Sequence, residues 1–547
     1  MTETKTNPIL RLLPSLTDVA FLLPLLFLFA GLNGARTMLG DGDTGWHVRA
    51  GEWMLAHGQV PRQDLFSYTR PEAPWYAWEW LWDVAFAWLH VRWGMADVVL
   101  ASLLVVCVTF ALLYRLVYRR CGNPLVAIAL TGLAGAGASI HWLARPHLFT
   151  TLFLVIFLSI LERVREGRTR LLWTLPVLTV PWTNLHGGFF VGILVLGIYG
   201  LGEVLAALLA GQGEEKAPRL RRAGAYFAAA AGCALASLAN PYGYHLHAHI
   251  FTYLRDPYLV KYIQEFQSTN FQWAQTTFLE VMLIFGICAA MWYGKRKQYG
   301  EVLMIAAWGH LSLMMGRNIP LYMLAAAPVA AQPIASWLRA AAHAPVAEWL
   351  RKGLGMFHEI AEEIHPLDKP WRLHAISALA MLAVALGLSS PVAGKKFQTN
   401  YDPAGYPEKA LALLGQPGQR VFSDDEWGDY LIYKLSPRGA KVFVDGRSDF
   451  YGAKFNQAYV DALNVKYTWP QTLEQYGVNT LLLRAADPLA GAVKESSRWR
   501  AVYDDGLAIV FQKTGGAAGQ LLPAGSAGPQ PQAIAVFGDS SRERSNQ

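Results

Sequence analysis

Charged residues are scarce in this sequence. Only 16% of the 547 residues are charged, whereas a soluble protein carries about 25%. With 53% hydrophobic residues and a mean hydropathy of +0.23, the composition excludes an ordinary soluble enzyme and predicts residence in a membrane. The net charge of +7 does not indicate a nucleic-acid partner, because the basic residues gather in short loops between apolar runs.

Cysteines are equally few, and the four present do not indicate a disulfide framework. Cys107, Cys233 and Cys288 fall inside apolar runs and Cys121 falls in a predicted cytoplasmic turn, so we expect small buried side chains. A small-residue cleavage site is missing after the first apolar run, which we interpret as a retained anchor rather than a signal peptide.

Long apolar runs are what the sequence has in abundance. A membrane helix needs about 20 mostly apolar residues, with about 17 tolerated. About eleven spans are predicted on this basis, at 19–36, 97–115, 124–142, 147–161, 171–185, 188–210, 223–240, 276–294, 301–316, 319–338 and 373–392.

The basic residues predict how these spans are oriented. Fourteen lysines and arginines lie in the turns 115–120, 163–170, 216–222 and 295–297, against four in the short turns on the other side. Because cytoplasmic turns are enriched in Lys and Arg, the N-terminus is predicted to be cytoplasmic. With eleven spans, the chain is expected to be a multi-pass membrane protein whose C-terminal domain lies outside, which for a bacterial inner membrane is the periplasm.

The first outer loop, residues 37–96, begins with the polar segment Gly40-Asp41-Gly42-Asp43-Thr44-Gly45-Trp46-His47. Residues 45–57 read as a helix, with Asp43 or Thr44 as its N-cap. A second amphipathic stretch follows that is crowded with tryptophan, which is typical of a helix in the headgroup region of a membrane.

The rest of the chain divides into three parts. Residues 338–372 form a predicted cytoplasmic connection with a mixed-charge helical piece, to which we assign no chemistry. In 396–513, strand-like runs at 420–422, 441–444, 480–483 and 508–512 alternate with helical ones, which predicts a small extracytoplasmic α/β domain after the membrane domain of residues 1–395. Residues 514–547 are rich in Gly, Ala, Ser, Pro and Gln and are predicted to be disordered.

Histidine and arginine side chains lie at the predicted outer ends of several spans, on the same side as the first loop. Ionisable groups near a bilayer are costly and usually face a cavity or a partner. We therefore expect these residues to gather around one outward-facing cavity together with Asp41, Asp43 and His47. They are His141, Arg145, His147, His186 and Arg317.

The combination favours chemistry on a phosphate-activated substrate. A carboxylate pair can act as general base for an acceptor hydroxyl, which gives Asp41 and Asp43 a catalytic role. The guanidinium groups of Arg145 and Arg317 match the oxygens of a departing phosphate. Together they suit transfer of a group from a phosphate-activated donor dissolved in the membrane.

Alternatives remain open at several of these positions. Asp43 can serve purely as a helix cap, whereas Asp41 between two glycines has no evident structural role, so Asp41 is the favoured functional carboxylate. No cofactor is required with certainty, but Asp41, Asp43 and His47 can also be interpreted as ligands of a divalent metal. Arg447 either pairs internally with Asp445 or Asp449, or touches an acceptor.

The chain resembles the GT-C superfamily of integral membrane glycosyltransferases. The resemblance rests on the acidic first outer loop, the amphipathic helix in that loop, the eleven spans and the C-terminal extracytoplasmic domain. The segments DGDTGWHVRAGEWMLAHGQVPRQDLFSYT, WGDYLIYKL and VFVDGRSDFYG are also similar to a group of bacterial multi-span proteins related to these enzymes. The similarity covers most of residues 15–513.

The resemblance implies a function. In GT-C enzymes an acidic residue of the first loop is catalytic and the donor is a polyprenyl-phosphate sugar, so this role falls on Asp41 or Asp43. The implied reaction transfers the sugar to a periplasmic lipid, glycan or protein acceptor. The alternative is a non-catalytic assembly protein, or a lipid-linked glycan carrier or polymerase component, which binds glycan at the outer face and docks a protein partner through residues 396–513.

Overall fold

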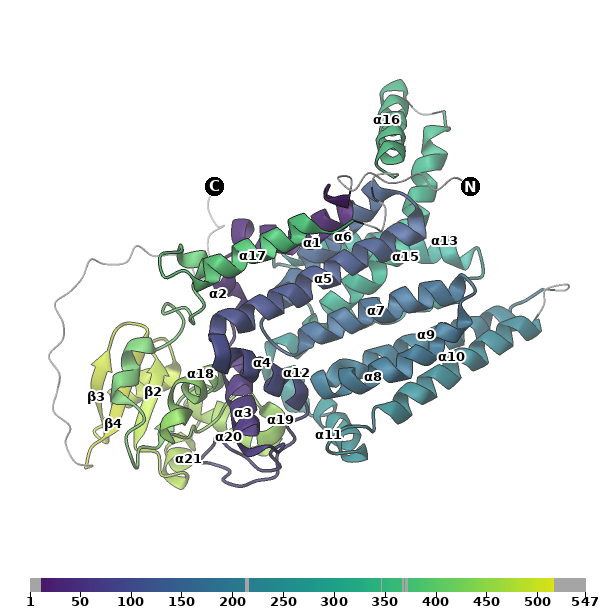
Figure 1. Cartoon of the computed structure of the whole chain (residues 1–547). Coiled ribbons are helices and arrows are strands. Elements are labelled where there is room, and N and C mark those ends of the chain that lie inside the picture. Colours follow the sequence, from purple (N-terminus) through teal and green to yellow (C-terminus); the bar gives the residue numbers. More distant parts are fainter. Residues whose placement is uncertain (1–10, 212–215, 346, 366–367, 369–371, 516–547) are drawn as a thin grey trace, which may run out of the picture.

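The computed structural model describes the whole chain except residues 1–10, 212–215, 346, 366–367, 369–371 and 516–547 (Figure 1). Most of the segment predicted to be disordered, 514–547, therefore lies outside the described residues. Up to residue 389 the described secondary structure is helical. The α-helices are α1 Leu16–Leu26, α2 Ala35–Met38, α3 Asp43–His57, α4 Trp80–Trp93, α5 Met95–Cys121, α6 Pro124–Ala138, α7 His147–Arg165, α8 Thr174–Leu185, α9 Phe190–Leu208, α10 Lys216–Ala236, α11 Tyr244–Leu254, α12 Pro257–Tyr262, α13 Thr276–Gly294, α14 Tyr299–Met314, α15 Ile319–Ala342, α16 Glu348–Ile364 and α17 Ala375–Ser389.

Short turns of 3-10 or π helix extend or connect several of these helices. They are η2 Phe27–Gly31, η3 Ser139–His141, η4 Thr169–Trp173, η5 Gly187–Phe189, η6 Gln264–Phe266, η7 Gly316–Asn318 and η8 Lys395–Phe397.

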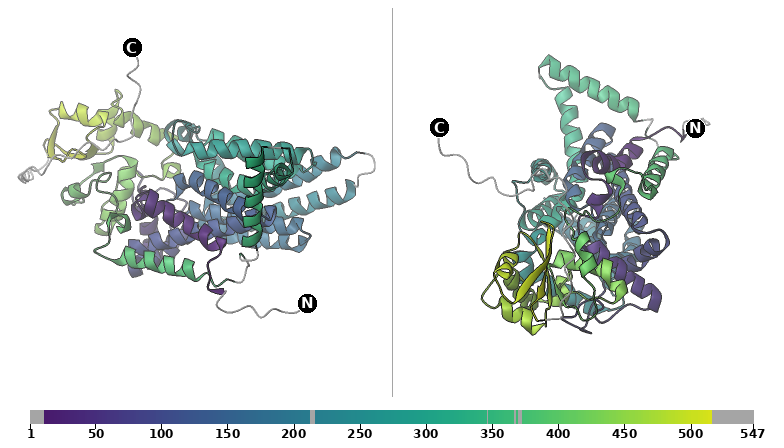
Figure 2. Two further views of the ribbon diagram at one scale, coloured as in Figure 1. Left: turned by 90° about the horizontal axis from the view of Figure 1, so that it is seen from above. Right: turned by 90° about the vertical axis from the view of Figure 1, so that its left-hand side faces the viewer.

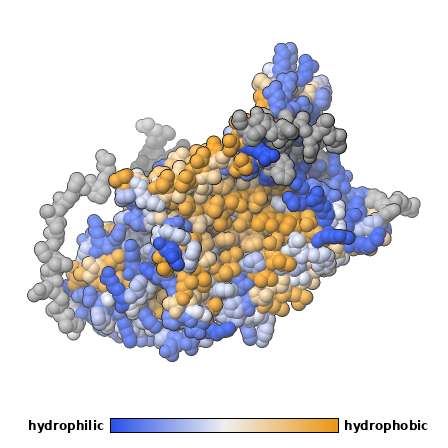
Figure 3. Space-filling model, in the orientation of Figure 1, coloured by the Kyte–Doolittle hydropathy of each residue, from blue (hydrophilic) through white to orange (hydrophobic). Residues whose placement is uncertain are grey.

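Among the described residues, six helices are long and apolar enough to cross a membrane: Met95–Cys121, Pro124–His141, His147–Arg165, Gly187–Leu208, Thr276–Gly294 and Gly316–Ala342. Two shorter apolar helices, Leu16–Gly31 and Ala375–Ser389, accompany them. The other three predicted spans coincide with α8, α10 and α14, so the number eleven stays a prediction. Hydrophobic surface forms a broad band across the middle of the molecule, flanked by hydrophilic surface (Figure 3). The protein is a helical membrane protein.

Local signals define where the helices begin and how they associate. Ser15 caps α1 in a reciprocal capping box with Asp18, and Asn123 caps α6, whose first residue is proline. The carboxylate of Asp18 also accepts hydrogen bonds from Ser377, at 2.6 Å, and from His374. This buried contact joins α1 to α17, which lie side by side at one flank of the bundle (Figures 1 and 2).

The C-terminal region carries a four-stranded sheet within the described residues, in the strand order β1-β2-β4-β3. β1 pairs with β2 in parallel, and the other two pairings are antiparallel. The elements are η9 Glu408–Leu413, β1 Val421–Phe422, α18 Asp425–Leu435, η10 Ser436–Arg438, α19 Ser448–Tyr451, α20 Ala453–Leu463, α21 Trp469–Gln475, β2 Thr480–Arg484, α22 Pro488–Lys494, β3 Trp499–Asp504 and β4 Ala508–Lys513.

In this part of the described chain, one predicted strand is absent and one strand was missed. Residues 441–444, all described, form no strand; Val442 makes an isolated parallel bridge with Ser67 of the first loop instead. β3 was not predicted, because its buried and exposed positions do not alternate cleanly. The partner of Val442 in this bridge comes from the first loop, and no local pattern in the sequence indicates that contact.

The first loop shares a hydrophobic core with the C-terminal domain. Trp46, Phe66 and Trp75 of the loop belong to the same buried cluster as Trp427 and Phe443. The prediction that the tryptophans of the second amphipathic stretch lie in the headgroup region is therefore wrong for Trp75, and also for Trp82, which packs in the membrane-domain core. The exposed Trp88 and Trp93 fit that prediction.

Candidate active site

The polar segment at the start of α3 is covered by the C-terminal domain. α3 begins at Asp43, and its N-cap is Gly42 rather than Asp43 or Thr44. The side chain of Asp41 does the capping, because its Oδ1 accepts a hydrogen bond of 2.7 Å from the backbone N–H of Asp43. Thus Asp41 has the structural role that the sequence pattern assigned to Asp43.

Both aspartates bind Arg145, which lies in the turn before α7. Nη1 of Arg145 is 2.6 Å from Oδ2 of Asp41, and Nη2 forms an ion pair with Oδ2 of Asp43. The backbone holds the two loops together, because Ala144 donates to the carbonyl of Met38 and accepts from the hydroxyl of Thr44. The Nε–H of Arg145 is buried and makes no hydrogen bond within the described residues.

Asp43 has an unusual protonation equilibrium. Burial raises its pKa, the charge of Arg145 lowers it and the charge of Asp41 raises it again; together these effects bring the pKa of Asp43 to about 7. The same pairing works on the other partner, since Asp41 and Asp43 raise the pKa of Arg145 further despite its burial. Asp43 is therefore poised to exchange a proton near neutral pH.

The C-terminal domain contributes Asp429, from α18, to the same point. The carboxyl of Asp429 is hydrogen-bonded to that of Asp43, and burial followed by the charge of Asp43 raises the pKa of Asp429 well above its usual range. The backbone N–H of Gly446 donates to Oδ1 of Asp429 at 2.9 Å. A Cβ at Gly446 would collide with Asp43 and would lie 2.7 Å from Oδ2 of Asp429, so only glycine allows this approach.

His47 is placed away from this pair. Its Nδ1 is 2.7 Å from Oδ1 of Asp83 on α4, and its ring stacks on that of Trp46 at a centroid distance of 3.6 Å. Burial, followed by the charge of Arg145, lowers the pKa of His47 well below its usual value. With only 2% of its side chain exposed, His47 cannot touch a substrate directly and instead orients α3 against α4.

Glu79 connects His47 to a second group of histidines. Its two carboxylate oxygens lie 3.6 Å from Nε2 of His47 and 3.5 Å from Nε2 of His186. Burial is the main reason why the pKa of Glu79 is raised to about 8. Glu79 was not predicted as a site residue from the sequence; its only signal there is an acidic side chain inside the tryptophan-rich stretch.

The histidine ring of His186 has a defined tautomer. The N–H of Gly188 donates to its Nδ1 at 3.0 Å, and the Thr150 hydroxyl, which accepts from Trp182, lies 2.7 Å from the same atom. Nδ1 is therefore the acceptor, and Nε2 carries the proton that faces Glu79. Burial, then Arg317 and Arg145, lower the pKa of His186 to about 3.

His147 contacts two other histidines of the site, His141 and His186. Nε2 of His147 donates to the carbonyl of His141 at 2.6 Å, and the ring centroids of His147 and His186 are 6.5 Å apart. Because Nε2 of His147 carries the donated proton, Nδ1 of the neutral ring is left as an acceptor.

Arg317 is held by a partner that was not predicted from the sequence. Its Nη1 is 3.5 Å from Oε1 of Glu265, and its guanidinium lies 4.2 Å from the ring centroid of Phe266. Although burial opposes the charged form of Glu265, Arg317 and then Arg145 lower its pKa to about 2. Arg317 therefore does not face the two aspartates; it is neutralised by a carboxylate of the loop after α12.

These groups form what we call the acid–base cluster, and it lies where the C-terminal domain meets the helical bundle. Several of its members reach water: 28% of the Asp41 side chain is exposed, and 29% of the Arg317 side chain. The cluster consists of Asp41, Asp43, Glu79, His141, Arg145, His147, His186, Glu265 and Arg317.

Metal binding finds no support in the geometry. Within the described ranges, no group of three or more His, Cys, Asp or Glu side chains is arranged to hold a metal ion. Two histidines of α11 have separate partners: His247 contacts Ser237 at 2.8 Å and His249 contacts Asp449 at 2.8 Å.

Arg447 forms internal ion pairs, and its side chain is not exposed to an acceptor. Its guanidinium is buried, 2.7 Å from Asp445 and 2.9 Å from Asp64 of the first loop, and Trp75 lies over it. The pairing with Asp445 was one of the two interpretations left open by the sequence. Arg447 is thus a link between the two domains.

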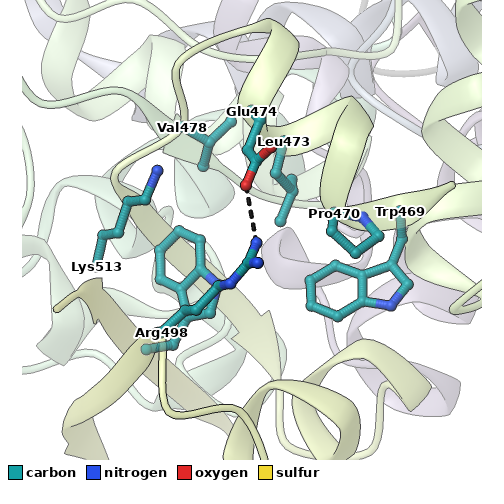
Figure 4. A pocket seen from close by; sticks show the side chains of 8 residues that line it. Trp469, Pro470, Leu473, Glu474, Val478, Arg498 and Lys513 are labelled. Carbon is teal, nitrogen blue, oxygen red and sulfur yellow. Dashed lines mark hydrogen bonds and ion pairs between the residues drawn. The ribbon is translucent and has the colours of Figure 1, made fainter.

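Two surface hollows lie outside the acid–base cluster. An open groove of about 550 Å³ runs between α4, α8 and the turn after α10; its wall includes Trp80 and Asn184, which share a 2.7 Å hydrogen bond. A second hollow, in the C-terminal domain, has a volume of about 20 Å³, and the ion pair of Arg498 with Glu474 crosses it (Figure 4). That volume accommodates about one water molecule, so this hollow is not a substrate site.

Comparison with protein-family models and with curated proteins finds no match for this chain. Among solved structures, a match is found to the Archaeoglobus fulgidus oligosaccharyltransferase in complex with Zn and sulfate, with a TM-score of 0.46 and 12% sequence identity. The match covers 86% of this chain and 68% of that chain. A likeness at this level assigns neither a family nor an activity.

Proposed function

We propose that this protein is a membrane glycosyltransferase, which transfers a sugar from a polyprenyl-phosphate-linked donor to a periplasmic lipid, glycan or protein acceptor. The observation that carries the proposal is the pair Asp41 and Asp43, bound to one arginine at the water-reaching edge of the helical bundle. A base for an acceptor hydroxyl and cations for a phosphate are thereby within one cluster.

Asp43 is the better candidate for the base. Its pKa of about 7 leaves a large fraction both of carboxylate, which can accept a proton, and of carboxylic acid at neutral pH. Asp41 is engaged in capping α3, so its carboxylate is held in a fixed position beside Arg145. The preference for Asp41 that the sequence suggested is therefore reversed in this proposal.

Arg145, Arg317 and the histidines would receive the donor phosphate. The unpaired Nε–H of Arg145 is a donor that neither aspartate uses, and the rings of His147 and His186 lie 6.5 Å apart in the same cluster. His47 acts indirectly, through Glu79.

The reaction step follows from these positions. The carboxylate takes the proton of the acceptor hydroxyl, and the hydroxyl oxygen forms a bond to the anomeric carbon of the sugar. The bond from that carbon to the phosphate oxygen breaks, and its electron pair stays on the lipid phosphate. The arginines stabilise this developing charge in surroundings with little water, where such interactions are strongest.

A second function is favoured by one observation. Asp43 is already hydrogen-bonded to Asp429, so the C-terminal domain closes over the acidic segment. A non-catalytic assembly protein, or a carrier or polymerase component that binds a lipid-linked glycan, would use the same cluster for binding only. Its protein partner would dock on residues 396–513.

Substitution of the aspartates separates the two functions. In a deletion strain, Asp41→Asn and Asp43→Asn should abolish the protein-dependent surface glycan, while Asp504→Asn, a matched change on an exposed strand of the C-terminal domain, should restore it. Membrane levels of each variant are measured in parallel. Wild-type glycans with both cluster variants would refute the catalytic role, and loss of a bound partner alone would favour the assembly function.

A further inference from the structure

α16 stands apart from the rest of the bundle. It follows α15, the last of the long apolar helices, and projects from the end of the molecule that lies away from the C-terminal domain (Figure 1). In both views of Figure 2 it runs across the direction of the spanning helices rather than along it. A helix with this direction lies roughly in the plane of the membrane.

The helix has two faces that differ in chemistry. One part of its apolar face packs inward, where Ala361 is buried and Phe357 contacts the bundle core. The adjacent part is uncovered: Trp349, Met356 and Ile360 lie on one stripe at spacings of seven and four residues. Their side chains are 75%, 60% and 41% exposed, respectively, and we call them the exposed stripe.

The sector of the helix that borders the exposed stripe is charged but has no cationic patch. Arg351 and Lys352 near the start are outnumbered by acidic residues, which are Glu348, Glu359, Glu362 and Glu363. In Figure 3 the projecting part of the surface is correspondingly hydrophilic over most of the visible area. An attraction to anionic lipid or to an acidic partner therefore does not explain the exposed stripe.

The chain connection keeps α16 close to the bilayer. α15 ends at Ala342 and α16 begins at Glu348. The five intervening residues can reach at most about 18 Å when fully extended, which is less than the thickness of half a bilayer with its headgroups. Trp337, near the end of α15, is also 40% exposed, as expected for a tryptophan at a membrane interface.

We propose that α16 lies in the boundary between headgroups and acyl chains of the membrane that holds the spans, with its exposed stripe inserted among the lipids. Amphipathic helices of this kind bury their apolar face about 5–10 Å below the headgroups. The lipid surface is the occupant that fits, because a short connection ties the stripe to a spanning helix with an exposed tryptophan near its end, and because the stripe lacks a charge pattern for a protein partner. The acidic face remains in water.

The proposal is tested by measuring the depth of two positions in full-length protein reconstituted into zwitterionic lipid vesicles. Met356→Cys on the exposed stripe and Glu359→Cys on the charged face are each labelled with an environment-sensitive fluorophore in a Cys288→Ser background. The other three cysteines are buried. Quenching by aqueous iodide is compared with quenching by lipids that carry a spin label just below the headgroups.

For an inserted helix, iodide quenching at Met356→Cys should be less than about half that at Glu359→Cys, with the opposite order for the spin-labelled lipid. Ile360→Cys should behave like Met356→Cys. The pattern should be the same with and without added anionic lipid. Equal iodide quenching at the two faces would overturn the proposal, and so would a stripe shielded from both quenchers, which would mean that protein rather than lipid covers it.

Discussion

Each end of the helical bundle holds an arginine between carboxylates, but the two arrangements differ. At the end away from the C-terminal domain, Arg120 pairs with Glu301 at 2.7 Å and with Glu162 at 2.9 Å, and Arg165 also binds Glu301. Arg120 and Glu301 are 3% and 4% exposed, whereas Arg145 and Asp41 are 23% and 28% exposed. The 18 residues of Pro124–His141 separate the two groups by about 27 Å.

The comparison teaches which buried charges join helices and which are available for chemistry. The Arg120 group consists of paired, almost fully buried charges and links α5, α7 and α14. The acid–base cluster adds histidines, an aspartate whose pKa is near neutral and access to water. Charge pairing alone therefore does not distinguish a structural site from a functional one; exposure to water does.

The largest expected effect is a loss of stability caused by substitution in the Arg120 group, which we call the closed end of the bundle because its charges are almost fully buried. Arg120→Gln removes the buried cation between Glu162 and Glu301 and leaves them only the more exposed Arg165, which costs about 3–5 kcal/mol. Thermal unfolding in detergent should reveal this loss. The matched change Arg119→Gln, in an ion pair with both partners at least 40% exposed, should cost less than about 1 kcal/mol. Similar losses for the two variants would contradict the closed character of the Arg120 group.

Substitution in the acid–base cluster, at the open end of the bundle, should lower the rate of sugar transfer. Arg145→Gln removes the cation shared by Asp41 and Asp43 and should lower sugar transfer about 10²–10³-fold, as for the loss of one group that stabilises transition-state charge. Arg120→Gln should leave transfer per folded molecule unchanged. Transfer by membranes of equal protein content is the measurement. An equal loss of transfer in both variants would remove the distinction between the two ends.

The approach of the C-terminal domain provides a finer test. Gly446→Ala would place a Cβ against Asp43 and Asp429, so the domain must shift, and a misplacement of about 1 Å can reduce the rate up to about 100-fold. Gly491→Ala, in α22 with open space around it, is the matched control and should be neutral. Unchanged transfer by the Gly446 variant would show that closure over Asp43 is not needed.

The pH dependence should show the smallest effect, about tenfold per pH unit at most. Because the base must be ionised, transfer should rise as the pH increases through about 7, the pKa of Asp43. The free energy of unfolding should fall over the same pH range. A carboxyl whose pKa is raised from 3.8 by folding stabilises the fold fully below pH 3.8, and this contribution is lost as the pH rises through about 7. Rates and unfolding temperatures between pH 4 and 8 test both; a flat rate profile would exclude Asp43 as the base.

The sequence predicted the side of the bundle on which the cluster gathers, because loop position and residue type already place Asp41, Asp43, Arg145 and His186 together. It could not assign the roles of the two aspartates, which depend on α3 beginning at Asp43 and on Asp41 accepting its N–H. Nor could it separate His47 from the aspartates, because its partner Asp83 is 36 residues away on α4.

Contacts between distant segments account for the remaining differences. Glu265 lies in η6, in a segment with no local motif, and its role follows only from its distance to Arg317. Asp429 and Gly446 stand in segments that the sequence marks as distinctive, yet their contact with Asp43 needs the C-terminal domain to fold against the first loop. Helices and sheet pairs follow from local patterns more readily than this docking does.

The central claim, that the acidic pair performs sugar transfer, is tested most directly with purified protein in vesicles supplied with a lipid extract that contains polyprenyl-phosphate sugars. The measured quantities are transferred sugar and donor retained by the protein. Asp43→Asn should retain the donor but transfer sugar at least about 100-fold more slowly than the wild type. Transfer at the wild-type rate by Asp43→Asn would contradict the claim.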